Sequence, residues 1–124
     1  EQIVEHRRVL LRRWPERRVC HAVRLQSGLW CANLHAQVHS EARAQADIAR
    51  AAATTLAWAR GGPALLGGDF NVREPAAAGF ERLGGAGVDH VLGHLVAAAG
   101  PVQVLPHGAL SDHAPLLLPV VPTI

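Results

Sequence analysis

The alternation of apolar and polar positions predicts strands in the first third of the chain. The cluster Val9-Leu10-Leu11 suits a strand, although its spacing also permits a helix, and Trp14-Pro15 breaks whatever element precedes it. Residues 18–26 alternate loosely and residues 29–34 are mostly apolar, so we expect two further strands there. Ser27-Gly28 lies between them and is typical of a tight hairpin turn.

The hairpin also bears on the two cysteines. A tight turn at Ser27-Gly28 sets a register in which Cys31 lies opposite Arg24, and therefore not opposite Cys20. A disulfide needs its two Cα atoms within about 7 Å. We therefore expect no disulfide and interpret both cysteines as small core residues.

Residues 41–60 carry the pattern of an amphipathic helix. Ser40 is a typical N-cap, Glu41 is favourable in the first turn, and Gly61-Gly62-Pro63 ends the pattern. The segment is rich in alanine, the strongest helix former. One face is apolar at helical spacing and consists of Ala44, Ile48, Ala52, Thr55, Leu56 and Ala59.

The second half of the chain predicts short strands. Apolar runs at 64–66, 88–92, 101–105 and 116–121 are the candidates. Residues 73–87 are expected to be loop, with one helical turn near residues 80–83. Helix and strand mix without strict alternation, which favours a layered α/β sandwich of the α+β class, with mostly antiparallel or mixed strands, over a doubly wound sheet.

Composition limits the class of protein. At 124 residues and 49% hydrophobic content, the chain is one domain or part of one and has enough apolar residues for a packed core. It has no apolar run of about 18 residues, so we expect no membrane span. The first residue is Glu1 rather than methionine, so we expect a processed product or a fragment of a longer chain.

The charge pattern permits an anionic partner without requiring one. The formal net charge is +2 and the pI is about 9.0. All 12 basic residues are arginine, and six of them fall within the first 18 positions. This cluster is either a patch that faces phosphate groups or a solvated face of the first element, and the sequence leaves both interpretations open.

Three short islands contain most of the chemically informative residues. They are Gly68-Asp69-Phe70-Asn71, Val88-Asp89-His90-Val91 and Ser111-Asp112-His113-Ala114-Pro115. The chain has only four aspartates, and three of them lie in these islands beside apolar runs. Because a half-buried carboxylate is costly without a cation or hydrogen bonds, the pattern predicts one polar site at the ends of strands. Such a site points to phosphoester chemistry.

The first island predicts a carboxylate at the edge of the sheet. An apolar strand ends in two glycines and delivers Asp69, with Asn71 two residues later. In an extended chain these two side chains share a face, while Phe70 points into the core. A carboxylate beside an amide can hold and polarise a water molecule near a metal ion, although an ordinary turn would also explain the motif.

The other two islands predict a hydrogen-bonded pair. His113 has the side chain of a general base or of a donor to a phosphoryl oxygen near neutral pH. Its neighbour Asp112 points to the opposite side of an extended chain and is free to bind a metal ion. Asp89 is the natural partner of His113 and would fix its tautomer, whereas an ion pair with an arginine is the alternative for Asp89.

In their order and spacing, the islands resemble the C-terminal part of the endonuclease/exonuclease/phosphatase superfamily, the deoxyribonuclease-I-like phosphodiesterases. Asn33-Leu34-His35 also resembles the strand-end Asn-Thr-His-Leu motif of that family, with Leu34 and Ala36 as departures. The resemblance covers residues 18–121. It implies two sheets stacked between helices, of which this chain would supply about half, so we expect a missing N-terminal half of the domain as its partner.

The resemblance also implies roles for individual residues. Asp69 and Asn71 match the pair that positions and activates the attacking water, and Asp89 matches the carboxylate that supports the active-site histidine. That histidine is matched by His113. The residues that would contact the scissile phosphate are His35, Asn71 and His113.

A divalent metal ion is implied as well. Asp112 matches a ligand of the catalytic ion, which is usually Mg²⁺, with Mn²⁺ as an alternative. The metal-binding glutamate of the family has no counterpart here, because Glu1 and Glu5 precede any matching pattern. We therefore expect that ligand to come from outside this sequence.

These observations predict a metal-dependent phosphoester hydrolase. A nuclease or phosphodiesterase is the first interpretation, with a phosphoester substrate that includes nucleic acid. The loops between the motifs are short and offer no insertion to probe a DNA groove. The alternatives are a phosphatase for small-molecule or lipid phosphoesters and an inactive, truncated domain with a binding role.

Two other patterns have competing explanations. The pairs His35/His39 and His90/His94 have the four-residue spacing that chelates zinc on a helix, but neither pair is expected on a helix. The tryptophans Trp14, Trp30 and Trp58 are expected to pack in or against the core, with base stacking as the alternative.

Overall fold

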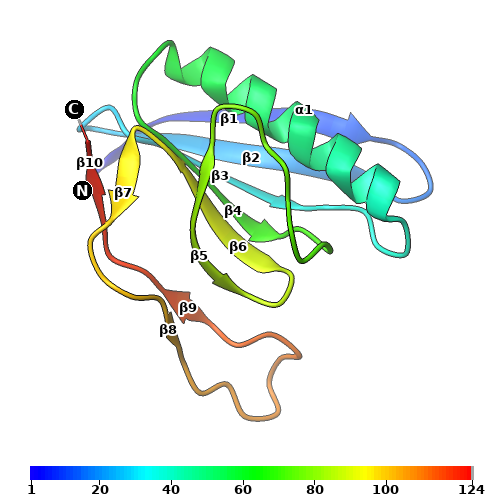
Figure 1. The fold of residues 1–124 in the computed structure, drawn as a ribbon. Helices are drawn as coiled ribbons and strands as arrows, with labels where there is room; N and C mark the ends of the chain where they lie inside the picture. Colours follow the sequence, from blue (N-terminus) through cyan, green and yellow to red (C-terminus); the bar gives the residue numbers. More distant parts are fainter. Residues whose placement is uncertain (124) are drawn as a thin grey trace.

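The computed structural model describes residues 1–123 as a six-stranded sheet with one long helix across one face (Figure 1). The elements in chain order are β1 (Ile3–Arg12), β2 (Arg18–Leu25), β3 (Trp30–His35), α1 (Glu41–Ala59), β4 (Ala64–Asp69), β5 (Glu81–Ala86) and β6 (Asp89–His94). The strand order is β1-β2-β3-β4-β6-β5. Strands β3 and β4 are parallel and joined by α1, and the other neighbours are antiparallel. The predicted α+β class with a mixed sheet is confirmed.

The helix begins and ends close to the predicted positions. The Ser40 side chain accepts a hydrogen bond from the Arg43 N–H, which satisfies one of the free donors of the first turn. The helix ends at Arg60, whose φ of 50° places it in the left-handed region. Its apolar face covers β1, β3 and β4. The largest apolar side chains that are completely buried in the resulting core are Phe70, Leu34, Ile48 and Leu66.

Two short strand pairs follow the main sheet. Strand β7 (Val96–Ala98) pairs with β10 (Val120–Pro122), and β8 (Gln103–Val104) pairs with β9 (Leu116–Leu117). Figure 1 shows the β8–β9 pair extending beyond the sheet, with the connecting residues 105–115 at its far end. This segment is called the His113 loop below. In residues 1–123 no helix has the length and apolar character needed to cross a bilayer.

Several predicted elements are corrected by the structure. Residues 81–86 form strand β5 instead of a helical turn, and β7 was not predicted. The expected strands 101–105 and 116–121 are shorter and divided. Glycine-rich β5 has low intrinsic strand propensity, but Gly85 lies where a Cβ would overlap the Asp89 carbonyl oxygen, so close pairing with β6 selects glycine there.

The register of the β2–β3 hairpin also differs from expectation. The Leu25 N–H donates to the Leu29 carbonyl, so the turn has three residues and Cys31 lies opposite Val23 instead of Arg24. Cys20 lies opposite Leu34, and both cysteines are free thiols.

Trp30 is buried and Trp58, which is half-buried, stacks against it as expected, with ring centroids 6.0 Å apart. Trp14, by contrast, is 68% exposed, and the Arg43 guanidinium lies 4.8 Å from the centre of its ring.

Candidate active site

Three site residues form one row across three neighbouring strands. His35 ends β3, Asp69 ends β4 and Asp89 begins β6. The register makes His35 and Asp69 direct partners, and likewise Asp69 and Asp89. Direct partners in a sheet point to the same face, so the pairing alone brings these three side chains together. Leu34 precedes His35 and is buried, so the row faces away from α1.

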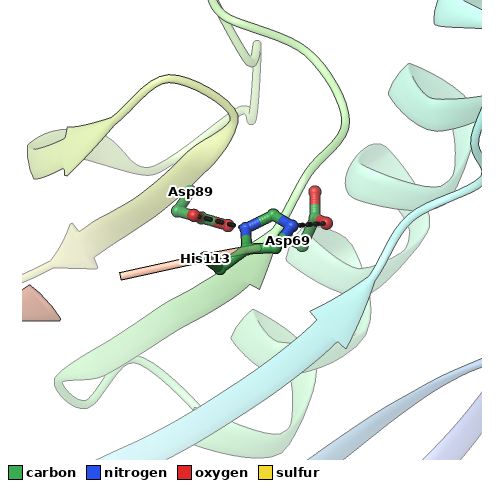
Figure 2. Close-up of side chains that lie close together, drawn as sticks. All are labelled: Asp69, Asp89 and His113. Carbon is green, nitrogen blue, oxygen red and sulfur yellow. Dashed lines mark hydrogen bonds and ion pairs between the residues drawn. The ribbon is translucent and has the colours of Figure 1, made fainter. Parts of the chain in front are cut away.

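The fourth residue, His113, comes from the His113 loop and lies between the two carboxylates (Figure 2). Its Nδ1 donates to Asp89 Oδ2 at 2.7 Å, because a carboxylate only accepts. Its Nε2 lies 3.4 Å from Asp69 Oδ2. The predicted Asp89–His113 pair is therefore confirmed in the structure. The convergence of Asp69 and His113 on one site was also predicted, whereas their direct contact was not.

Asp69 is the centre of this arrangement. Its Oδ2 also lies 3.3 Å from His35 Nε2, so it faces two imidazoles. Its Oδ1 accepts the backbone N–H of Asn71 at 2.9 Å. Only 17% of the Asp69 side chain is exposed, whereas the His113 and His35 side chains are 46% and 60% exposed. The Asp69 carboxylate is thus held by the backbone of its own loop, while the two imidazoles beside it remain open to a substrate.

The position of Asn71 corrects one expectation. Phe70 is fully buried as predicted, but the backbone of Asn71 is left-handed, with φ of 51°, and not extended. Its side-chain amide donates to the Ala36 carbonyl at 2.8 Å. This contact uses one of the two N–H donors of the amide. Asn71 therefore ties the loop after β4 to the end of β3.

The electrostatic environment raises the pKa of His113. The largest cause is the hydrogen bond from its ring to Asp89, followed by the negative charge of Asp89; the charges of Asp69 and Asp112 add to it, and partial desolvation opposes them. When His113 is protonated, Nε2 carries a hydrogen toward Asp69 Oδ2. When it is neutral, Nε2 and Oδ2 are two acceptors facing one another. The site therefore favours an imidazolium ion.

Asp112 lies beside this cluster and has a different environment. It is exposed, and within residues 1–123 its carboxylate enters no ion pair. The group of residues with mutually close metal-ligand atoms consists instead of Asp69, Asp89 and His113, whose atoms lie within 4.8 Å of one another. Both nitrogens of His113 in that group already face carboxylates. The group is therefore better described as a hydrogen-bonded array than as a metal cage.

A shallow hollow of about 410 Å³ opens in front of the array. Its polar lining includes the imidazoles and carboxylates of His35, Asp69, Asp89 and His113. Its apolar lining includes Val91, Ala114 and Leu116. The hollow can therefore hold a polar group against the array and also contact a less polar group.

One supporting residue was missed by the sequence analysis. Asp47 lies inside α1 and is only 1% exposed, yet it accepts hydrogen bonds from Arg12 Nε at 2.6 Å and from the Gln37 backbone N–H at 2.9 Å. Gln37 follows the β3 strand end that carries His35. The available signal was the position of Asp47, one residue before Ile48 on the predicted apolar face.

The fold is shared with solved structures of phosphoesterases. The endonuclease/exonuclease/phosphatase protein of Bacteroides vulgatus has a TM-score of 0.79 and 13% identity, over 98% of this chain and 66% of that one. The mannosyl-6-phosphatase of Bacteroides thetaiotaomicron has a TM-score of 0.76 and 18% identity, over 97% and 67%. Truncated TDP2 of Caenorhabditis elegans has a TM-score of 0.63 and 14% identity, over 92% and 64%.

These likenesses confirm the predicted resemblance at the level of the fold. No family model matches the sequence, and no curated protein matches it either. The chain has the fold of the C-terminal part of an endonuclease/exonuclease/phosphatase protein. It spans about two thirds of the length of the solved structures named above.

Proposed function

We propose that this chain carries the catalytic residues of a metal-dependent phosphoester hydrolase. The observation that supports the proposal best is the position of His113, which lies 2.7 Å from Asp89 and 3.4 Å from Asp69. Strand register and a separate loop converge on this point from three distant parts of the sequence. An imidazolium held between carboxylates, in an open hollow, is suited to receive a negatively charged phosphoryl group.

The proposed mechanism uses the array in two ways. The Nε2–H of protonated His113 turns from Asp69 to a phosphoryl oxygen of the substrate and stabilises the charge that develops there, with His35 as a second contact. A water molecule placed by Asp69 and Asn71 attacks phosphorus in line with the leaving oxygen. Its proton passes to Asp69 as the new phosphorus–oxygen bond forms. The ester bond breaks with its electron pair on the leaving oxygen, which takes a proton from solvent and departs as the alcohol.

Asp112 fits the requirements of a magnesium ligand. Mg²⁺ takes oxygen ligands and is usually held by one or two carboxylates together with water and substrate phosphate oxygens. An exposed carboxylate next to the hollow, without an ion pair in residues 1–123, meets that requirement. Bound there, Mg²⁺ or Mn²⁺ would supply Lewis-acid stabilisation of phosphate charge. Further ligands would come from water, the substrate and an N-terminal partner segment.

The substrate that we favour is a phosphodiester, including that of a nucleic acid. The apolar lining residues Val91, Ala114 and Leu116 offer a surface for an organic group that is esterified to the scissile phosphate. A phosphodiester carries an organic group on both sides of phosphorus. A phosphomonoester carries only one, and its three non-bridging oxygens share the negative charge. Phosphatase activity on small or lipid phosphoesters is the alternative that the same fold accommodates.

The proposal is tested by kinetics on a small panel of substrates. Turnover of bis(p-nitrophenyl) phosphate, p-nitrophenyl phosphate and a single-stranded oligonucleotide is measured with Mg²⁺, with Mn²⁺ and with EDTA. Asp69→Asn and His113→Gln should each lower kcat at least about 100-fold, because each removes a group that acts in the proton transfer or on the developing charge. Glu74→Gln and His107→Gln are matched controls at exposed positions and should be unchanged.

Two results would contradict the proposal. Activity that survives the double loss of Asp69 and His113 would reject the mechanism. A folded wild-type chain that turns over none of the substrates with either ion, when assayed together with the N-terminal partner segment, would favour the alternative of a binding module. Equilibrium binding of the same oligonucleotide would then be the measurement to make.

A further inference from the structure

His90 is a buried histidine directly behind the row of site residues. It follows Asp89 on β6, and successive side chains of a strand point to opposite faces, so His90 faces the core while Asp89 faces the site. Only 2% of His90 is exposed. A buried polar ring is costly unless its nitrogens are hydrogen-bonded. Its partners therefore indicate what the ring contributes.

Both ring nitrogens have partners, and these partners fix the position of the proton. Nε2 of His90 lies 2.9 Å from the Val72 carbonyl oxygen, which only accepts, so Nε2 carries the hydrogen. Nδ1 lies 3.0 Å from Arg82 Nε, which only donates, so Nδ1 accepts. The ring is held in one tautomer and connects β5 with the loop after β4. This also excludes a shared zinc ligand pair with His94, whose Nδ1 contacts the Gly79 carbonyl.

The loop that His90 holds is the one that carries Asn71. Val72 follows Asn71, whose left-handed backbone, with φ of 51°, is favoured by the local hydrogen bond from its N–H to the Asp69 side chain. The Phe70 ring lies 5.6 Å from the His90 ring, and the Phe70 N–H donates to the Val88 carbonyl at 2.9 Å. The residues on both sides of Asn71 are thus anchored to β6 or to the residue before it.

We propose that His90 is a positioning residue for hydrolysis: its ring holds the loop that carries Asn71 and, through the rigid start of β6, the Asp89 carboxylate that orients His113. This inference rests on the proposed function. Loss of the ring would displace Asn71 and Asp89 by fractions of an ångström without removing a group that touches the substrate. Misplacement of that size lowers turnover more than substrate affinity.

The test compares two substitutions of different reach. His90→Gln keeps an N–H donor long enough to approach the Val72 carbonyl, whereas the side chain of His90→Asn is too short. We expect His90→Asn to lower kcat about 10- to 100-fold with KM changed less than about threefold, and His90→Gln to recover most of that loss. Rescue by the longer amide is an effect that simple damage to the core would not produce.

His94→Asn is the matched control. His94 lies on the same strand and the same face as His90, and its ring also contacts a loop carbonyl, at 2.7 Å from Gly79. Gly79 lies in the same β4–β5 connection as Asn71, but at the end next to β5, and it lines a different hollow from the site residues. His94→Asn should lower stability in urea but leave kcat within about twofold of wild type, because the change lies away from the reacting groups. The proposal is overturned if His90→Asn behaves like His94→Asn, that is, if its stability falls and its kcat stays at the wild-type value.

A measurement without substrate separates this inference from the proposed function. In NMR spectra of the free protein, His90→Asn should shift the backbone amide of Asn71 and the ring resonances of His113, whereas His94→Asn should shift neither. If these shifts occur and the wild-type chain hydrolyses no phosphoester, the proposed function fails and the positional coupling stands. If both sets of resonances stay in place, the positioning role is wrong whatever the activity.

Discussion

Gly68 offers a direct test of how backbone packing sets the site. It lies on β4 directly before Asp69, and its φ of 140° is a backbone conformation that residues with a side chain rarely adopt. A Cβ at this position would overlap the Leu34 carbonyl oxygen on the neighbouring strand β3 and lie 3.3 Å from Asn33 Nδ2. The obstacle is backbone, so the strands themselves would have to separate.

The expected cost of Gly68→Ala follows from these contacts. Overpacking costs about 1–3 kcal/mol and an unfavourable φ about as much again, so we expect the free energy of unfolding to fall by about 2–6 kcal/mol. Separation of β3 and β4 occurs one residue before His35 and Asp69, which are direct partners. A displacement of about 1 Å there should lower kcat about 100-fold.

The adjacent glycine is the matched control for this prediction. A Cβ at Gly67 would lie 3.5 Å from the His90 carbonyl oxygen, which is an ordinary contact, and its φ is not in the left-handed region. Gly67→Ala should therefore be neutral or stabilise by up to about 0.5 kcal/mol. Both variants are measured by urea unfolding and by turnover of the best substrate. Equal stability of the Gly68→Ala and Gly67→Ala proteins would refute the reasoning.

Three further predictions concern charge. Asp47→Ala should lower the free energy of unfolding in urea by about 3 kcal/mol, because it breaks a buried pair, whereas Glu16→Gln in an exposed pair should cost less than about 0.5 kcal/mol. The folded state raises the pKa of His113, so protonated His113 stabilises the fold at pH values below the ordinary histidine pKa of about 6.5, and this stabilisation is lost as pH rises through the folded-state pKa. Asp89→Asn should lower the pKa of His113, measured by NMR titration, and remove this stabilisation. Asp112→Asn should raise the Mg²⁺ concentration for half-maximal turnover at least about tenfold, and an unchanged Mg²⁺ dependence would reassign the metal ligand.

Local signals in the sequence were sufficient for the helix and for one pair of site residues. The Ser40 cap and the glycines after residue 60 act within one turn of the helix, so the boundaries of α1 did not depend on the rest of the fold. The Asp89–His113 pair was inferred from side-chain chemistry together with the family resemblance. It required only that two specific islands meet.

Features that depend on strand pairing could not be predicted from local patterns in the sequence. The position of Asp69 next to His113 depends on the antiparallel register of β4 and β6 and on where the His113 loop returns to the sheet. Strand β5 was missed for the same reason, because Gly85 is explained by its close approach to β6 and Gly84 by its contact with Val102 and Leu118, and neither by local propensity. The turn at Asn71 is partly local, because its N–H donates to the Asp69 side chain two residues earlier, whereas the hydrogen bond from its amide to Ala36 depends on the position of the end of β3.

The charge balance of the site supports the proposed metal dependence by an independent route. Asp69, Asp89 and Asp112 all lie near His113, and each contributes negative charge that raises the pKa of its ring. Even with His113 protonated, this group is net negative, and a phosphoester adds further negative charge. Substrate would be repelled from such a hollow unless a cation entered with it. Turnover that is equally fast with Mg²⁺ and in EDTA would therefore contradict the proposed metal dependence and the role of Asp112 as a metal ligand.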